Sequence, residues 1–280
     1  MNGERIHRAT SDDGTEIAGR VHGQGPPLVL VPGAMSDGEF VWRPLLPLLT
    51  DHFACFAMST RGRGLSGAST DLGPERLVQD VTAFVDSIGE PVALFGWSQG
   101  AYLALGAAEN TAAVTAAAVF EPPVTSVMSE EAAQQLTERM STMGTLAAEG
   151  ELEDAARTFM SWLANDDEMA EADALDFVAS WGSNVPGFLA EMQETLQSEV
   201  LGAIEPAELA KVTVPLLLMH GNRSIPLDWW LDSIHHVSEH VRDPRVSEIR
   251  NAGHFGPMSE PAAVADELIR FFAAIPALQS

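Results

Sequence analysis

The 280-residue sequence predicts an α/β fold with a doubly wound, mostly parallel eight-stranded sheet and an inserted helical cap. Short apolar runs that suit buried strands alternate with amphipathic helical segments along most of the chain. The turn Gly96-Trp97-Ser98-Gln99-Gly100 lies between one such run and a helix of small residues. Residues 124–206 contain helical patterns but no strand candidate. We therefore expect a core domain of residues 1–123 and 207–280, into which residues 124–206 are inserted as a cap (lid).

The strands are predicted from short apolar or β-branched runs bounded by turn residues. The first two should pair as an antiparallel hairpin at the sheet edge, because the Asp12-Asp13-Gly14 turn tolerates positive φ. The eight predicted strands cover residues 7–10, 16–22, 28–31, 53–58, 92–95, 115–120, 214–221 and 246–250.

The helices are predicted from apolar residues at the 3-4 spacing of an amphipathic helix. The segment over residues 74–88 is the clearest, with Pro74 at its start and Gly89 at its end. In the core domain, helices are expected over residues 42–49, 74–88, 101–108, 227–241 and 261–275. In the cap they are expected over residues 129–149, 151–163, 172–181 and 187–204.

The pentapeptide around Ser98 matches the G-x-S-x-G turn that joins a strand to a helix in serine hydrolases. Glycine at its two ends lets strand and helix pass closely, and the turn exposes the serine hydroxyl at the edge of the sheet. A serine hydroxyl becomes a useful nucleophile when a base takes its proton. The natural base is His254, in the loop between the last predicted strand and the last helix, at the same sheet edge.

Charge and apolar patterning limit the partners. The formal net charge is −25, from 15 basic and 40 acidic residues. Nucleic acids and anionic membranes bind basic patches, so we expect neither as a partner. Because no apolar run reaches the length of a membrane span and the first residues do not resemble a signal peptide, the sequence favours a cytoplasmic protein. It is compatible with a monomer or a homodimer.

No cofactor or metal site is expected. The single cysteine, Cys55, lies in an apolar run and should be buried, and His235, His236 and His240 fall on a predicted surface helix without further ligands at zinc-type spacing. The glycine-punctuated loop over residues 60–67 lacks the lysine and the following helix of a phosphate-binding P-loop.

Five motifs occur in order along nearly the whole chain: Gly14-Thr15-Glu16, the run from Gly23 to Gly33, Arg61-Gly62-Arg63-Gly64-Leu65-Ser66, the turn around Ser98, and Gly253-His254-Phe255. Their order and spacing resemble the α/β-hydrolase fold superfamily. The resemblance implies an oxyanion hole made by the backbone N–H groups of Gln99 and Ala34.

The acid that should orient His254 departs from the superfamily's commonest pattern. Its usual position, just after Met219-His220-Gly221, is occupied by Ser224. In some members, among them several haloalkane dehalogenases and the fungal zearalenone lactonases, the acid lies at the end of a different strand. This is the strand that follows the helix after the nucleophile turn. Here that position is Glu121, fixed by Pro122 and Pro123. We favour Glu121 and keep Asp228 as the alternative acid.

The predicted function is cofactor-free hydrolysis of a small-molecule carboxylic ester or lactone through a Ser98-His254-Glu121 triad. Aromatic residues in or near the cap favour a bulky apolar or aromatic substrate. The expected pocket residues are Met35, Trp162, Trp181 and Phe255. The alternative is a non-hydrolytic member with a ligand-binding, lyase or cyclase-like role, because fold alone does not fix function.

Overall fold

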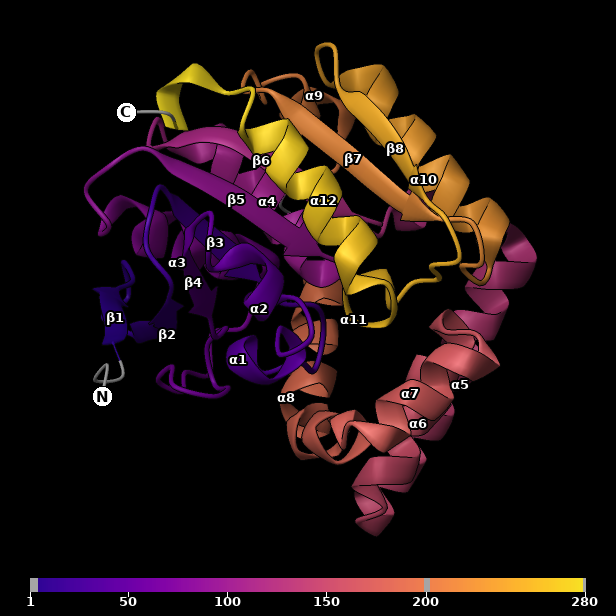
Figure 1. The fold of residues 1–280 in the computed structure, drawn as a ribbon. Coiled ribbons are helices and arrows are strands. Elements are labelled where there is room, and N and C mark those ends of the chain that lie inside the picture. Colours follow the sequence, from indigo (N-terminus) through magenta and orange to yellow (C-terminus); the bar gives the residue numbers. More distant parts are fainter. Residues whose placement is uncertain (1–4, 199–201, 279–280) are drawn as a thin grey trace.

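The computed structural model describes residues 5–198 and 202–278. Its strands form one eight-stranded sheet in the order β1-β2-β4-β3-β5-β6-β7-β8 (Figure 1). The pairs β1/β2 and β2/β4 are antiparallel, and every pair from β4 to β8 is parallel. The predicted fold class is therefore confirmed. The strands are β1 Arg5–Thr10, β2 Glu16–His22, β3 Pro27–Val31, β4 Ala54–Met58, β5 Val92–Trp97, β6 Val114–Phe120, β7 Leu216–Gly221 and β8 Arg245–Ile249.

Helices cover both faces of the sheet, as the alternation of strand and helix predicts. In the first part of the chain they are α1 Gly38–Val41, α2 Leu46–Leu49, α3 Pro74–Asp86 and α4 Gln99–Asn110. Between β6 and β7 lie a 3₁₀ turn at Thr125–Val127, α5 Glu130–Glu149, α6 Leu152–Leu163, α7 Asp166–Ala174, α8 Phe177–Gln197 and α9 Pro206–Leu209. The last part contains α10 Leu227–His240, α11 Gly256–Ser259, α12 Pro261–Phe272 and a 3₁₀ turn at Pro276–Leu278.

The core has two layers because alternate residues of each strand face opposite sides of the sheet. In β3, Leu28 and Leu30 join one buried cluster, whereas Val29 and Val31 join the other. The first cluster includes apolar residues of α2 and α12, and the second includes those of α3, α4 and α10. Cys55 is buried in the first cluster, and burial raises the pKa of its thiol to about 12, which leaves it unreactive.

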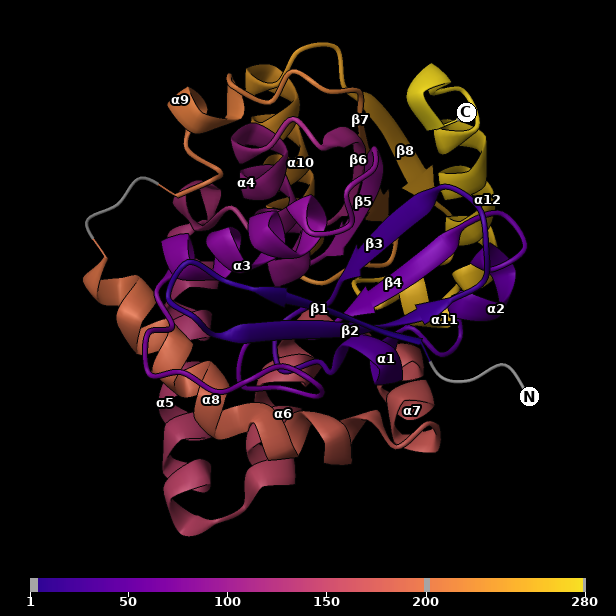
Figure 2. The same cartoon turned by 90° about the vertical axis from the view of Figure 1, so that its left-hand side faces the viewer.

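The helices α5–α8 form the segment for which the sequence predicted a cap, and they contain no strand among the residues described. Figures 1 and 2 both show them gathered on one side of the sheet. Side chains of α7 and α8 contact the loops that follow β3, β4 and β8. The segment thus covers the edge at which the parallel strands end.

The predicted break between two cap helices at residues 182–186 is wrong, because α8 runs from Phe177 to Gln197 through Pro186. An interior proline costs a helix about 3 kcal/mol. The buried face of α8, which includes Trp181, Val185 and Phe188, offsets that cost. Gly182 lies at the contact with α6, where a Cβ would approach the Glu153 backbone nitrogen to 3.1 Å.

The helix α7 begins six residues before the predicted position 172. The sequence contains a capping signal for this start, but the prediction from apolar spacing did not use it. Asn165 caps the helix by accepting a hydrogen bond from the Glu168 N–H, and Asp166, Asp167 and Glu168 occupy its first turn.

Candidate active site

The turn at Ser98 has the geometry that its sequence predicts. Strand β5 ends at Trp97, helix α4 begins at Gln99, and Ser98 between them has φ 57° and ψ −122°. A side chain on Gly96 would collide with the backbone of Gly100, and one on Gly100 would collide with the carbonyl oxygen of Val31. Both glycines are therefore required for the strained serine to be held at the end of the sheet.

His254 lies beside this serine, in the loop between β8 and α11. Its Nε2 atom is 3.0 Å from Ser98 Oγ, and its Nδ1 atom is 2.7 Å from Glu121 Oε2. The exposed fractions of Ser98, His254 and Glu121 are 8%, 1% and 0%. The structure thus brings the three predicted residues into one buried hydrogen-bonded line.

Glu121 follows the last residue of β6 and has φ 48°. Its second carboxylate oxygen, Oε1, accepts hydrogen bonds from the Gly221 N–H at 2.9 Å and the Ser224 hydroxyl at 2.5 Å. The serine at the usual acid position therefore donates to the carboxylate that contacts His254. The alternative acid, Asp228, is exposed in the first turn of α10, and the structure does not bring it to His254.

The two backbone groups expected to form an oxyanion hole lie at the same edge. Gln99 is the first residue of α4, where N–H groups have no partner inside the helix. Ala34 follows β3, which pairs with β5. A Cβ on Gly100 would lie 2.5 Å from the Pro32 carbonyl oxygen, so the serine turn and the loop after β3 are in contact.

Two tryptophans that the sequence did not place in the site fix His254. Trp230 of α10 stacks on the imidazole with a centroid distance of 4.2 Å and an interplanar angle of 14°. The indole N–H of Trp97 donates to the His254 carbonyl at 2.7 Å. Trp97 belongs to the pentapeptide itself, but its partner is 157 residues away, so only the tertiary structure reveals this contact.

The four expected pocket residues differ in how closely they approach His254. Met35 is fully buried, and its carbonyl accepts a hydrogen bond from Asn184 of α8. Trp181 donates to the Ser36 hydroxyl at 3.2 Å, and its ring lies 5.2 Å from that of Phe255.

Trp162 is more distant from His254. Its ring stacks on that of Trp229, with the ring centroids 5.6 Å apart. Trp229 contacts Trp230, and Trp230 stacks on the imidazole of His254.

Two arginines of the loop over residues 60–67 form buried ion pairs with α3 and α8. The Nε and Nη2 atoms of Arg61 donate 2.6 Å hydrogen bonds to the two carboxylate oxygens of Asp80 of α3. Arg63 pairs with the buried Glu191 of α8 at 2.6 Å, and the same carboxylate accepts a hydrogen bond from the Gln99 side chain at 3.1 Å. Both arginines are thus paired with carboxylates.

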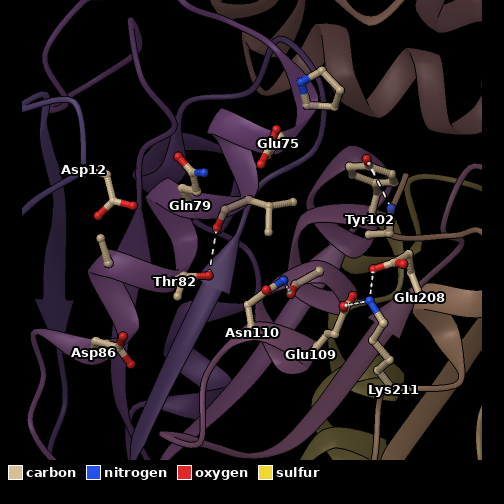
Figure 3. Close-up of a pocket in the computed structure, with 15 residues that line it drawn as sticks. Asp12, Glu75, Gln79, Thr82, Asp86, Tyr102, Glu109, Asn110, Glu208 and Lys211 are labelled. Atoms are coloured by element: carbon tan, nitrogen blue, oxygen red, sulfur yellow. Dashed lines mark hydrogen bonds and ion pairs between the residues drawn. The ribbon is translucent and has the colours of Figure 1, made fainter. Parts of the chain in front are cut away.

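The structure also contains a hollow of about 480 Å³ along α3, α4 and α9 (Figure 3). Its charged lining residues are mainly acidic, and the lining includes none of the predicted site residues. Within residues 5–198 and 202–278, no three or more His, Cys, Asp or Glu side chains are arranged to hold a metal ion. None of the described helices has the length and apolarity needed to cross a membrane.

Comparison of the chain with known proteins shows which family it belongs to. Residues 28–267 match the model of the alpha/beta hydrolase family. An alpha/beta hydrolase from Sphaerobacter thermophilus is 29% identical, with a TM-score of 0.75 over 95% of this chain and 100% of that one. An esterase from Rhodococcus is 23% identical, with a TM-score of 0.72 over 96% and 99% of the two chains. An enol-lactonase from Burkholderia xenovorans is 20% identical, with a TM-score of 0.74 over 95% and 99%. The chain belongs to the alpha/beta hydrolase family.

Proposed function

We propose that this protein is a cofactor-free serine hydrolase that cleaves a carboxylic ester or lactone. The observation that carries the proposal is the unbroken hydrogen-bonded line from Ser98 through His254 to Glu121. Ser98 and His254 are within the distance that proton transfer requires, and Glu121 is within hydrogen-bond distance of the imidazole that it would orient. Membership of the alpha/beta hydrolase family supports the same reaction class.

In the first half of the reaction, Ser98 Oγ attacks the substrate carbonyl carbon while His254 Nε2 takes the hydroxyl proton. The tetrahedral oxyanion accepts hydrogen bonds from the N–H groups of Gln99 and Ala34, and removing one such donor typically costs about 3 kcal/mol of barrier. His254 then returns the proton to the leaving alcohol, which leaves an acyl group on Ser98. Water hydrolyses this acyl-enzyme by the same steps, with His254 as its base.

The carboxylate of Glu121 keeps the base in the useful tautomer. It accepts a hydrogen bond from Nδ1–H, so the lone pair of the neutral ring lies on Nε2, toward Ser98. It also stabilises the imidazolium that forms when the proton is taken. The stacked Trp230 ring adds to this, because an aromatic face attracts a cation.

A fluorophosphonate tests the proposal directly. Attack by Ser98 Oγ would form a bond to phosphorus and expel fluoride, and mass spectrometry should locate the adduct on Ser98. The variant Ser98→Ala should lose both the adduct and turnover of p-nitrophenyl butyrate. Ser11→Ala, which changes a buried serine of the N-terminal hairpin, should keep both. Ligand binding without any turnover by the wild-type protein would favour the lyase, cyclase-like or purely ligand-binding alternative.

The substrate class is proposed to be bulky and apolar or aromatic, because aromatic rings of the helical segment and of α10 surround the catalytic line. Trp181→Phe should change the ratio of kcat/KM for a naphthyl ester to that for a small acetyl ester by about fivefold or more, the effect of roughly 1 kcal/mol of pocket contacts. Trp162→Phe, whose ring is separated from His254 by Trp229 and Trp230, should change the ratio less. Equal effects of Trp181→Phe on both esters would mean that the helical segment does not select substrate.

A further inference from the structure

One carboxylate of the helical segment contacts the His254 loop but has no part in the proposed triad. Glu168, in the first turn of α7, is 4% exposed. Its Oε1 atom accepts hydrogen bonds from the Gly253 N–H at 2.9 Å, the Phe255 N–H at 3.0 Å and the Ser259 hydroxyl at 3.1 Å. Glu168 therefore binds the backbone on both sides of His254.

The loop is shaped to admit this carboxylate. A Cβ on Gly253 would lie 2.2 Å from Glu168 Oε2 and 2.6 Å from the amide nitrogen of Asn165, so both side chains would have to move to admit a larger residue. Asn165 donates to Oε2 at 3.0 Å, which completes the hydrogen bonding of the carboxylate. Glu168 is thus a built contact and not an incidental neighbour.

Three hydrogen bonds to side chains of other elements hold the backbone of residues 253–255, beside the hydrogen bond that the Arg223 N–H donates to the Ala252 carbonyl. The sheet supplies one anchor, because the Trp97 indole N–H donates to the His254 carbonyl. Glu168 supplies the other two, on the N–H groups of Gly253 and Phe255. If the helical segment moved away, two of these three anchors would be lost, while Glu121 would still contact the imidazole from β6.

The residues of the proposed site are largely buried. Ser98 is 8% exposed and His254 is 1% exposed, so little of either side chain is open to solvent in this arrangement. Trp181 and Asn184 of α8 contact the loop after β3, and Glu168 of α7 contacts the His254 loop. Many enzymes with a covered site admit their substrate by opening a loop or domain and react after closure.

We propose that Glu168 is a positioning residue, which aligns His254 with Ser98 only when the helical segment is closed over the sheet. Closure then completes the site as well as covering it. The proposal rests on the proposed roles of Ser98 and His254. It implies that loss of Glu168 slows the chemical step more than it weakens substrate binding.

The surroundings of Glu168 disfavour its charged form. Burial raises the pKa of Glu168 to about 7, although hydrogen bonds from Ser259 and Gly253 oppose the rise. Negative Glu121 across the loop raises it further, and the charged Arg223 also lies nearby. Burying the charged carboxylate costs free energy, and the hydrogen bonds from the loop offset that cost when the segment is closed.

The test compares a replacement of Glu168 that cannot accept hydrogen bonds with one that still can. Glu168→Met removes the acceptor and should lower kcat on p-nitrophenyl butyrate by about tenfold or more, since two buried N–H groups lose their partner. KM should stay within about twofold, and the rate of fluorophosphonate labelling at Ser98 should fall by the same factor as kcat. Asp167→Asn, a neighbour on α7 whose partner is the exposed Arg223, is the matched control and should match the wild type.

A second pair of variants keeps the test decisive if Glu168→Met does not fold. Glu168→Gln can still accept from the loop, but its amide group faces the amide of Asn165, and kcat should fall by about threefold or more. The double substitution Asn165→Asp/Glu168→Gln restores a donor and acceptor pair there and should recover kcat to within about twofold of the wild type.

Two results would overturn the inference. One is a folded Glu168→Met protein with wild-type kcat. The other is an Asn165→Asp/Glu168→Gln protein no more active than Glu168→Gln. Turnover retained by Ser98→Ala would instead refute the proposed function, so the two failures are distinguishable.

Discussion

Replacing His254 by alanine should lower kcat on p-nitrophenyl butyrate by about 10⁴-fold or more, the scale seen when a serine hydrolase loses its base. Among the residues that the structure describes, His254 is the only one whose side chain hydrogen-bonds to the Ser98 hydroxyl. No neighbouring group can therefore take the proton in its place. The measurement is steady-state turnover of the purified variant, with folding checked by circular dichroism.

The matched control for this variant is His235→Ala. His235 is 69% exposed on α10, and its ion pair with Glu239 lies on the surface. Its replacement should leave kcat within about twofold of the wild type, as surface substitutions usually do. A His254→Ala enzyme with more than a tenth of wild-type turnover would remove His254 from its proposed role.

Replacing Glu121 by glutamine should lower kcat by roughly 10³ to 10⁴, although the two side chains have nearly the same shape. The reason lies in the second oxygen of Glu121, which accepts from Gly221 N–H and the Ser224 hydroxyl. In the amide, the oxygen must stay on that side, so the NH₂ group faces His254 Nδ1. The histidine would then carry its proton on Nε2, where it cannot accept one from Ser98.

The comparison for this variant is Asp228→Asn, which makes the same chemical change at the alternative acid. Asp228 is exposed in the first turn of α10, where a carboxylate contributes about 1 kcal/mol or less through the helix dipole. Its turnover should stay within about threefold of the wild type. If Asp228→Asn proved the more damaging of the two folded variants, the role of the acid would belong to Asp228.

The sequence predicted the sheet because its strands are coded locally. Each buried strand is a short apolar run, and the turn around Ser98 needs glycine at two positions for steric reasons that can be recognised without a structure. The wrong prediction of a break within α8 has the opposite cause. Pro186 is a local signal for a break, and the tertiary packing of Trp181, Val185 and Phe188 outweighs it.

The site was predictable to the extent that its residues follow strand ends. Ser98 and Glu121 directly follow β5 and β6, and His254 lies in the loop after β8, where a doubly wound sheet collects functional groups. Glu168 could not be found in this way. It lies on a helix outside the sheet, and its contact with Gly253 and Phe255 depends on how the segment α5–α8 packs. Ser224, which marked a missing acid in the sequence, is a hydrogen-bond donor to the acid that replaces it.

The proposed nucleophile and acid come from one β-α-β unit, β5-α4-β6, whereas the proposed base, His254, is 156 residues from Ser98 and 133 from Glu121. The base is carried by the loop after β8, which is the last strand of the sheet and has one paired edge. Edge elements open locally at a lower free energy than central strands. Fraying of β8 would withdraw the base while β5 and β6 keep the serine and carboxylate in place. In a denaturant titration, catalysis should therefore disappear before the sheet does.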